Sequence, residues 1–365
     1  MTSSPVITSV GLLTALGAGR QAVTDAWREG QMGEPLADGA AAGGRRSVAV
    51  KARGLFPEQR GMLRRMDRLS RLISVSAALA RDDGQGLGDP KELGLAVGTD
   101  LGPLEATWNF LTRLREKGPA LANPMDFPNL VPNAGAGYVG ILLGLQGPSQ
   151  TFCQHELCGD EAIAWAADGV RTGWFPGALA GGAEEFGEVR ARGQLATRCS
   201  DEEQVLGEGS ALLLVESQER AEARQARPLA RHLGFRAETV KLRSPLLIEF
   251  HGDALERLVS RTLDSVGARP EDVGAVLASP ARQPEIAEGV ERALGRSVPA
   301  TDHDVRFGTF ASDGALRVGL AALLLSDRSL PVNANGELRD GPLALVVSVA
   351  RGGGLCASLL GEVEA

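Results

Sequence analysis

The sequence predicts an α/β fold in which strands and helices alternate along most of the 365 residues. Three observations lead to this fold class. Short apolar or β-branched runs, each the length of one strand, alternate with longer segments whose apolar residues recur at helical spacing. The 47 glycines exceed the usual share of about 7% and often stand in turn-like clusters, as tight strand–helix junctions require. With 4% aromatic residues, the core should consist mainly of Leu, Val and Ala.

Each predicted strand is a short run rich in Val, Ile, Leu or Ala that ends near glycine or another turn residue. The first covers residues 5–10, just before Gly11. In chain order, strands are expected at residues 5–10, 47–50, 93–97, 151–153, 178–181, 211–216, 230–234, 273–278, 344–348 and 355–360. Because helices separate most of these strands, the pattern predicts a parallel sheet covered by helical layers.

Each predicted helix carries apolar residues three or four positions apart. In the segment 58–81, for example, Leu63, Met66, Leu69 and Ile73 share one face. In chain order, helices are expected at residues 21–29, 58–81, 104–117, 137–145, 158–171, 217–225, 253–266, 285–294 and 314–325. A loop rich in Gly and Ala is expected at residues 30–45.

The composition argues against several classes of function. A net charge of −8 is unlike a nucleic-acid-binding protein, which usually presents a basic face. No apolar run approaches the roughly 18 residues of a membrane span, and the N-terminus lacks the charged and apolar regions of a signal peptide. The four cysteines are irregularly spaced, which predicts reduced thiols and a cytoplasmic protein. The four histidines are scattered, so no metal site is expected, and nothing in the sequence calls for a cofactor.

The most distinctive stretch is residues 147–162, where Gly-Pro-Ser is followed by a short strand and then by a helix that opens near small residues. This stretch resembles the nucleophile loop of β-ketoacyl synthases, the enzymes that join acyl units in fatty-acid and polyketide assembly. Further stretches match the family pattern in the same order, so the resemblance covers nearly the whole chain: residues 6–11, 64–68, 98–102, 133–137, 180–184, 207–209, 270–273, 352–353 and 357–358.

The resemblance implies a thiolase-like α/β fold of two similar βαβ halves, residues 1–226 and 227–365. Each half would contribute a mixed five-stranded sheet, and the two sheets would stack with helices in five layers, helix–sheet–helix–sheet–helix. The second half of the sequence repeats the element types of the first, which hints at an internal duplication.

Counting along the family pattern places Glu156 at the position of the catalytic Cys. The two family His positions fall on Ser279 and Gly308, the Lys position falls near His303, and the Phe-Gly-Phe-Gly-Gly gating loop falls on residues 349–353. Attack of a carboxylate on a thioester gives a reactive anhydride instead of a stable stored acyl group. Without the His pair, nothing manages the proton and charge of decarboxylation. No catalytic residue is therefore expected.

Such a chain resembles the non-catalytic chain length factor, or ketosynthase β subunit, of type II polyketide synthases, in which Gln commonly stands at the nucleophile position. The resemblance implies a heterodimer with an active ketosynthase, service by an acyl carrier protein, and a role in setting polyketide or polyene chain length. The acyl tunnel would be lined by Glu156, Trp108, Phe110 and Leu111, and the three residues of the helix would close its far end at the dimer interface; a plain core role is the alternative for these three. Arg64 and Arg65 would dock the carrier protein; the alternative is a solvated face with ion pairs.

Other interpretations of the site remain open. Glu156 is expected to have a structural role, bonded to backbone amides or bridging to the partner subunit. Cys153 and Cys158 flank it and are expected to be small, buried apolar side chains. One rival function is an atypical decarboxylase or acyltransferase that uses Glu156 or a nearby Cys. A second rival is a homodimeric structural protein of the same fold without a synthase partner.

Overall fold

The computed structural model describes residues 3–34, 60–197, 205–241, 252–279, 284–297, 303–331 and 341–363. The predicted strand at residues 47–50 and most of the predicted loop at 30–45 lie outside the described residues. Within these ranges, no helix has the length and apolar character needed to cross a membrane.

Within the described residues, ten strands form one continuous sheet, in the order β4-β3-β5-β6-β1-β7-β10-β9-β8 with β2 beside β1. Their bounds are β1 (Pro5–Thr14), β2 (Gly17–Ala18), β3 (Leu93–Gly98), β4 (Ser149–Phe152), β5 (Gly177–Glu184), β6 (Gly209–Ser217), β7 (Ala230–Thr239), β8 (Val273–Ser279), β9 (Leu343–Val349) and β10 (Gly354–Gly361).

The sheet is mixed, so the parallel sheet predicted from strand–helix alternation is wrong and the mixed sheet implied by the family resemblance is right. Strand β3 runs parallel to β4 and β5, and β8 runs parallel to β9. The remaining pairs are antiparallel. The physical reason is visible at β9 and β10, which are joined only by a short turn, η7 (Arg351–Gly353). A connection this short turns the chain back on itself and permits only an antiparallel pair.

The strand order repeats between the two parts of the chain. The series β3-β5-β6-β1 and the series β8-β9-β10-β7 have the same sequence of parallel and antiparallel neighbours. The two series meet where Val6 and Ile7 of β1 pair with β7. This repetition agrees with two similar halves, and the division at residue 226 stays a prediction.

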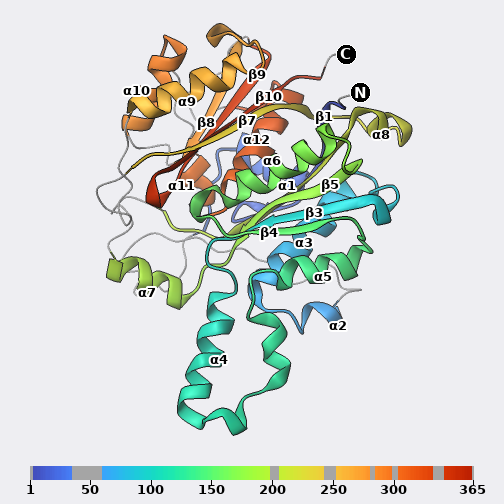
Figure 1. Ribbon diagram of the computed structural model, residues 1–365, viewed down its shortest axis with the longest axis vertical. Helices are drawn as coiled ribbons and strands as arrows, with labels where there is room; N and C mark the ends of the chain where they lie inside the picture. Colours follow the sequence, from blue (N-terminus) through green and yellow to red (C-terminus); the bar gives the residue numbers. More distant parts are fainter. Residues whose placement is uncertain are drawn as a thin grey trace.

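The helices stack with the two parts of the sheet in five layers (Figure 1). Helices α3 and α5 cover the outer face of the N-terminal strands, α6 and α12 pack together in the centre, and α9 and α10 cover the C-terminal strands. The α-helices are α1 (Arg20–Arg28), α2 (Arg60–Leu63), α3 (Arg68–Asp83), α4 (Leu104–Lys117), α5 (Ala134–Leu143), α6 (Cys158–Arg171), α7 (Glu188–Thr197), α8 (Gln218–Ala223), α9 (Gly252–Asp264), α10 (Pro284–Leu294), α11 (His303–Phe307) and α12 (Gly314–Ser326).

The helix predicted over residues 58–81 is broken into α2 and α3. Asp67 caps the start of α3, where its carboxylate accepts the backbone N–H of Ser70 at 2.9 Å. A capping side chain satisfies a backbone donor that would otherwise have no partner at a helix start, so it favours a new start over continuation. Arg64 and Arg65 consequently lie in the turn between the two helices.

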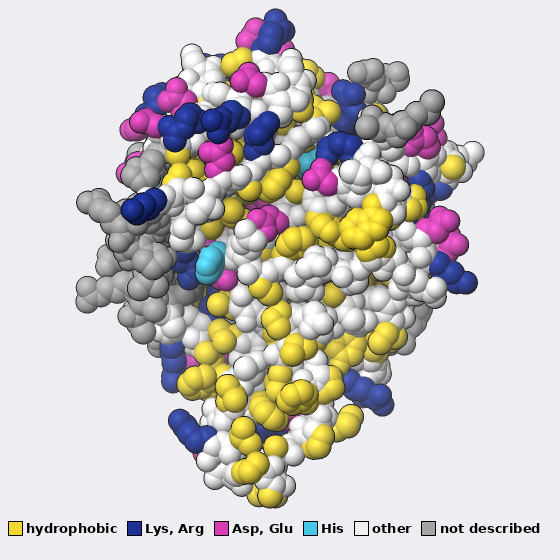
Figure 2. Space-filling view, viewed as in Figure 1, with side chains coloured by type: hydrophobic (Ala, Val, Ile, Leu, Met, Phe, Trp, Pro, Cys, Tyr) yellow, Lys and Arg dark blue, Asp and Glu magenta, His cyan; other side chains and the backbone are white. Residues whose placement is uncertain are grey.

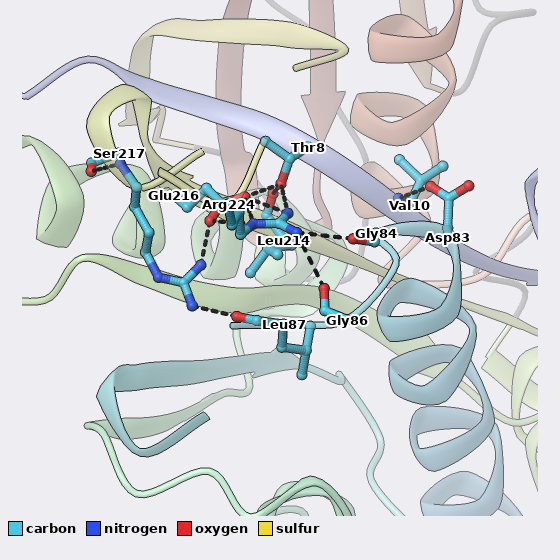
Figure 3. A network of polar contacts seen from close by, with 11 residues as sticks. Thr8, Val10, Asp83, Gly84, Gly86, Leu87, Leu214, Glu216, Ser217 and Arg224 are labelled. Carbon is cyan, nitrogen blue, oxygen red and sulfur yellow. Dashed lines mark hydrogen bonds and ion pairs between the residues drawn. The ribbon is translucent and has the colours of Figure 1, made fainter. Parts of the chain in front are cut away.

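One buried carboxylate holds several N-terminal segments together (Figure 3). Glu216 at the end of β6 is fully buried and is paired with Arg220 and Arg224 of the α8 region. Thr8 of β1 also donates to this carboxylate. Arg224 in turn donates to the carbonyl of Gly84 at 2.9 Å, which fixes the loop after α3. A buried charge is tolerated when it is paired and hydrogen-bonded in this way.

Candidate functional site

Glu156 lies where the sequence comparison with ketosynthases places the nucleophile, in a single 3-10 turn, η5 (His155–Leu157), between β4 and α6. The turn packs closely on the end of β3. A Cβ atom at Gly98 would lie 2.2 Å from the carbonyl oxygen of Cys158, so only glycine lets α6 begin at this point. His155 has a φ of 50°, a left-handed backbone conformation that non-glycine residues adopt rarely and at a cost.

The carboxylate of Glu156 binds Arg351, a residue from the C-terminal part of the chain. Its Oε1 accepts the Nε–H of Arg351 at 2.5 Å, and its Oε2 accepts the backbone N–H of Arg351 at 3.0 Å. Arg351 also donates from Nη2 to Asp100 Oδ2 at 2.8 Å. His155 Nδ1 lies 3.3 Å from the other oxygen of Asp100. The nucleophile position is therefore the centre of an ion-pair cluster made of Asp100, His155, Glu156 and Arg351.

The turn that carries Asp100 is fixed from below by a buried carboxyl group. Glu184 at the end of β5 accepts the backbone N–H of Asp100 at 2.8 Å and the hydroxyl of Thr99 at 3.1 Å. Burial raises the pKa of Glu184 to about 7, although buried Arg190 nearby opposes the shift. Glu185 beside it accepts the N–H of Glu105, and burial raises its pKa to about 7 as well. Through these hydrogen bonds, Glu184 and Glu185 hold the turn after β3 in place.

Neither family His position has an imidazole. Ser279 is the last residue of β8; its side chain lies outside the described atoms. Gly308 follows α11 and has a φ of 77°, which favours glycine. His303, at the family Lys position, is buried at the start of α11, and burial lowers its pKa to about 3. At neutral pH His303 is therefore uncharged, unlike a lysine.

The two cysteines that flank Glu156 differ in exposure. Cys158 is buried, as expected, but Cys153 is exposed, so its prediction as a buried side chain is wrong. The reason is that Cys153 follows β4, an edge strand whose first residues face outward. Desolvation, and then the charges of Glu184 and Asp100, raise the pKa of both thiols. A raised pKa leaves less thiolate, so neither thiol is activated as a nucleophile.

A second charged network lies behind the nucleophile turn, and the sequence analysis did not identify it. Asp160 of α6 accepts the hydroxyl of Ser348 at 2.9 Å, and Ser348 accepts from Arg317 Nη2 at 2.6 Å. Arg317 of α12 is buried and also pairs with Asp313 at 2.5 Å. The sequence signal that could have identified this network is the presence of Asp160 and Arg317 in the predicted apolar helices at 158–171 and 314–325. Among the described residues, no group of three suitable side chains could hold a metal ion.

Below the nucleophile turn, α4 and the segment after it present an apolar surface. Helix α4 has no buried residue, and Trp108 and Leu111 are each 53% exposed, so a core role for these two side chains is excluded within this chain. Phe110 packs edge-on against Phe127, with ring centroids 6.3 Å apart. We define the apolar face as the exposed large side chains of this region: Leu101, Trp108, Leu111, Leu121, Met125, Phe127, Val131 and Ile141.

Helix α4, which carries Trp108 and Leu111 of this apolar face, lies at the lower end of the molecule. Figure 1 shows α4 projecting away from the layered body, and Figure 2 shows apolar side chains gathered over the same lower region. In the part of the chain that the structure describes, β4 pairs with β3 alone, so its outer edge is open next to this region. An open strand edge and a large apolar surface are features that sites of association between chains commonly present.

Arg64 and Arg65 are exposed in the turn between α2 and α3, and the carbonyl of Arg65 accepts a hydrogen bond from Asn129 at 2.9 Å. Arg68, in contrast, pairs with buried Glu208 and donates to it from Nε at 2.8 Å. Arg64 and Arg65 are thus exposed, whereas Arg68 is held by its ion pair with Glu208. Docking of a carrier protein on them stays a prediction.

The five-layered fold with a nucleophile turn at the start of its central helix is a thiolase-like ketosynthase fold. It is similar to the ishigamide ketosynthase/chain length factor (TM-score 0.85, 19% identity, covering 100% of both chains). It is also similar to a β-ketoacyl synthase from Burkholderia phymatum STM815 (TM-score 0.84, 19% identity, covering 99% of this chain and 100% of that one). A third neighbour is a chain of the AntDE:AntF complex, described as a type II PKS acyl-carrier protein with its ketosynthase bound to the hexaketide (TM-score 0.84, 17% identity, full coverage of both chains).

Residues 52–221 match the family model described as β-ketoacyl synthase, N-terminal domain. A curated relative, 3-oxoacyl-[acyl-carrier-protein] synthase 2 from Staphylococcus aureus, is 28% identical over 232 residues, which cover 58% of this chain. The aligned region spans 57% of the length of that relative. The solved structures, at less than 20% identity, establish the fold, and the family model matches the N-terminal part of the chain, over residues 52–221.

Proposed function

We propose that this chain is a non-catalytic ketosynthase-like subunit, a chain length factor, that pairs with an active ketosynthase and shapes its acyl tunnel. The observation that carries the proposal is the state of the nucleophile position. Glu156 stands there and is bound by Arg351 through both carboxylate oxygens. Hydrogen bonds at both oxygens make a carboxylate a weaker nucleophile, and its attack on a thioester would give a reactive anhydride and not a stable acyl-enzyme.

The remaining catalytic positions support the same proposal. A condensing enzyme needs groups that stabilise the enolate and oxyanion charge as they develop. Gly308 supplies no side chain, and His303 is neutral because burial lowers its pKa to about 3. At these two predicted positions the chain supplies no charged group for decarboxylation, and this supports the proposal of a non-catalytic subunit.

The proposed partner is an active ketosynthase of the same fold. The apolar face and the open edge of β4 offer the kind of surface that obligate dimers bury, and an isolated chain would expose it to water. Trp108 and Leu111 on this face would then close the far end of the partner's tunnel. An acyl carrier protein would serve the complex, with Arg64 and Arg65 as its docking residues on this chain.

One experiment separates this proposal from the rival enzyme. The purified chain is incubated with malonylated carrier protein, and carbon dioxide and covalent adducts are measured by isotope release and intact mass. We expect neither above background, whereas a ketosynthase with an intact Cys-His-His set releases carbon dioxide in the same assay. Release or an adduct on Glu156, Cys153 or Cys158 would establish the decarboxylase or acyltransferase instead.

A second experiment tests the partner. The chain is expressed alone and together with a ketosynthase encoded beside it, and the products are compared by size-exclusion chromatography with light scattering. We expect a stable heterodimer on co-expression and poor solubility alone, because the apolar face is then uncovered. A well-behaved homodimer that does not exchange with the ketosynthase would support the rival structural protein.

A further inference from the structure

One amide side chain, that of Asn129, joins two other segments of the N-terminal part of the chain. Its Nδ2 donates to the carbonyl of Arg65 at 2.9 Å, and its Oδ1 accepts the hydroxyl of Tyr138 at 2.8 Å. Asn129 is the last residue of η4 (Pro124–Asn129), Arg65 lies between α2 and α3, and Tyr138 belongs to α5. Because the donor and the acceptor of the amide are both in use, its orientation is fixed. We call this arrangement the Asn129 bridge.

The Asn129 bridge acts on the backbone of the turn between α2 and α3. The N–H of Arg65 donates to the carbonyl of Met62 at 3.0 Å, so both backbone polar groups of Arg65 are hydrogen-bonded. Met66, the next residue, is buried, and Asp67 caps the start of α3. The backbone of the turn is therefore held from several sides, while the side chains of Arg64 and Arg65 stay exposed.

The two arginines of this turn carry positive charge on a protein whose net charge is −8. Among the described residues, neither Arg64 nor Arg65 forms an ion pair. The acidic residues of the two joined segments are already engaged, because Asp67 caps α3 and Asp126 of η4 is paired with Arg113. The turn therefore offers two positive charges to an acidic partner.

We propose that Asn129 is a positioning residue for the acyl carrier protein: its bridge holds the backbone at Arg65, so that Arg64 and Arg65 present their charges in a fixed arrangement. This inference rests on the proposed function, because it takes the carrier protein as the partner of these arginines. Long arginine side chains lose conformational freedom when they bind, and a backbone that is already ordered adds nothing further to that cost. Asn129 is uncharged and acts through the carbonyl of Arg65, without contact with the carrier.

The test uses the heterodimer with the ketosynthase partner and measures binding of the apo acyl carrier protein by fluorescence titration at low salt. Asn129→Leu removes both hydrogen bonds of the bridge with little change in volume and no change in charge. We expect the carrier to bind about three- to fivefold more weakly, which is the usual effect of one neutral hydrogen bond on an equilibrium. Tyr138→Phe removes only the bond that orients the amide, so it should give a smaller loss in the same direction. It also carries the test where Asn129→Leu fails to assemble.

A mutational cycle separates positioning from an independent contribution to binding. Asn129→Leu is combined with reversal of Arg64 and Arg65 to Glu. Because Asn129 acts through these arginines, its removal should cause no further loss of carrier affinity once they are reversed. Hydrogen exchange at the backbone N–H of Arg65 should also be faster in Asn129→Leu. The matched control is Gln21→Leu, which removes an exposed amide bonded to Asp25 on α1 and should change neither the affinity nor the exchange.

Failure of this inference and failure of the docking prediction give different results. Unchanged carrier affinity in the assembled Asn129→Leu heterodimer, while reversal of the arginines still weakens binding, would overturn the role of Asn129 and leave docking on Arg64 and Arg65 standing. Additive losses in the combined variant would also overturn it, because Asn129 would then act independently of the arginines. Arginine reversal without any effect would remove the docking prediction, and the positioning role with it, but not the proposed subunit role.

Discussion

The charged network behind the nucleophile turn makes a prediction about how stability depends on pH. Asp160 is fully buried, and desolvation raises its pKa from 3.8 to about 6 although Arg317 and Ser348 oppose the shift. A carboxyl group whose pKa is raised on folding binds its proton more tightly in the native state. Its contribution to stability is therefore full below the unfolded pKa of 3.8 and is lost as the pH rises through about 6.

The magnitude follows from the two pKa values. A rise from 3.8 to about 6 corresponds to about 3 kcal/mol in full, of which about 1.4 kcal/mol is lost between pH 5 and pH 8. Asp160→Asn removes the titration and keeps an acceptor for the Ser348 hydroxyl. We therefore expect the variant to gain about 1.4 kcal/mol relative to the wild type on going from pH 5 to pH 8.

The assay is urea unfolding of both proteins at a series of pH values between 5 and 8, followed by tryptophan fluorescence. Glu184 and Glu185 also have raised pKa values of about 7, so both proteins should lose stability with rising pH. The difference between the two curves isolates Asp160 because the other groups are common to both. A difference in unfolding free energy that does not change with pH would refute the reasoning.

Three further predictions concern the tunnel, the carrier and the core. Trp108→Ala in the heterodimer should lengthen the polyketide product, because it removes a large side chain from the proposed tunnel end. The masses of the products test this. An unchanged product spectrum at wild-type yield would contradict it. Reversing both Arg64 and Arg65 to Glu should weaken carrier binding about tenfold at low salt in a fluorescence titration, and equal affinity would remove these residues from the docking surface. Gly314→Ala should lower the free energy of unfolding by about 3 kcal/mol, since the added Cβ would lie 1.7 Å from Asp160 Oδ2. An unchanged melting temperature would contradict this.

Local signals in the sequence were enough to predict the helices whose ends are marked by residues such as Pro and Gly. The helices at 104–117 and 158–171 were predicted with the bounds that the structure gives to α4 and α6. Helix α4 is bounded by Pro103 and Gly118, which mark a start and an end in the sequence itself. The helix at 58–81 failed because one aspartate, Asp67, caps a new helix within an unbroken apolar pattern. Helix α7 was missed because Glu188–Thr197 has no apolar stripe.

In the candidate site too, local signals predict some contacts and not others. Asp100 and Glu156 follow β3 and β4, which are parallel neighbours with Gly98 opposite Phe152. Since parallel strands end at the same edge, the proximity of these two carboxylates follows from the local strand assignment. Arg351 is different, because it lies 195 residues from Glu156 and approaches it across the central helical layer.

The contact between Arg351 and Glu156 depends on how the two parts of the sheet stack, and no periodicity or motif in either segment encodes that distance. The sequence therefore predicts, through the family pattern alone, which catalytic groups are replaced. It does not identify what the replacing carboxylate binds, because this depends on a contact between two halves that are far apart in the chain. A glutamate at the nucleophile position and an arginine in the gating segment each resemble an isolated loss of function. Brought together by the fold, they form an ion pair, and this contact supports the proposal that Glu156 has a structural role.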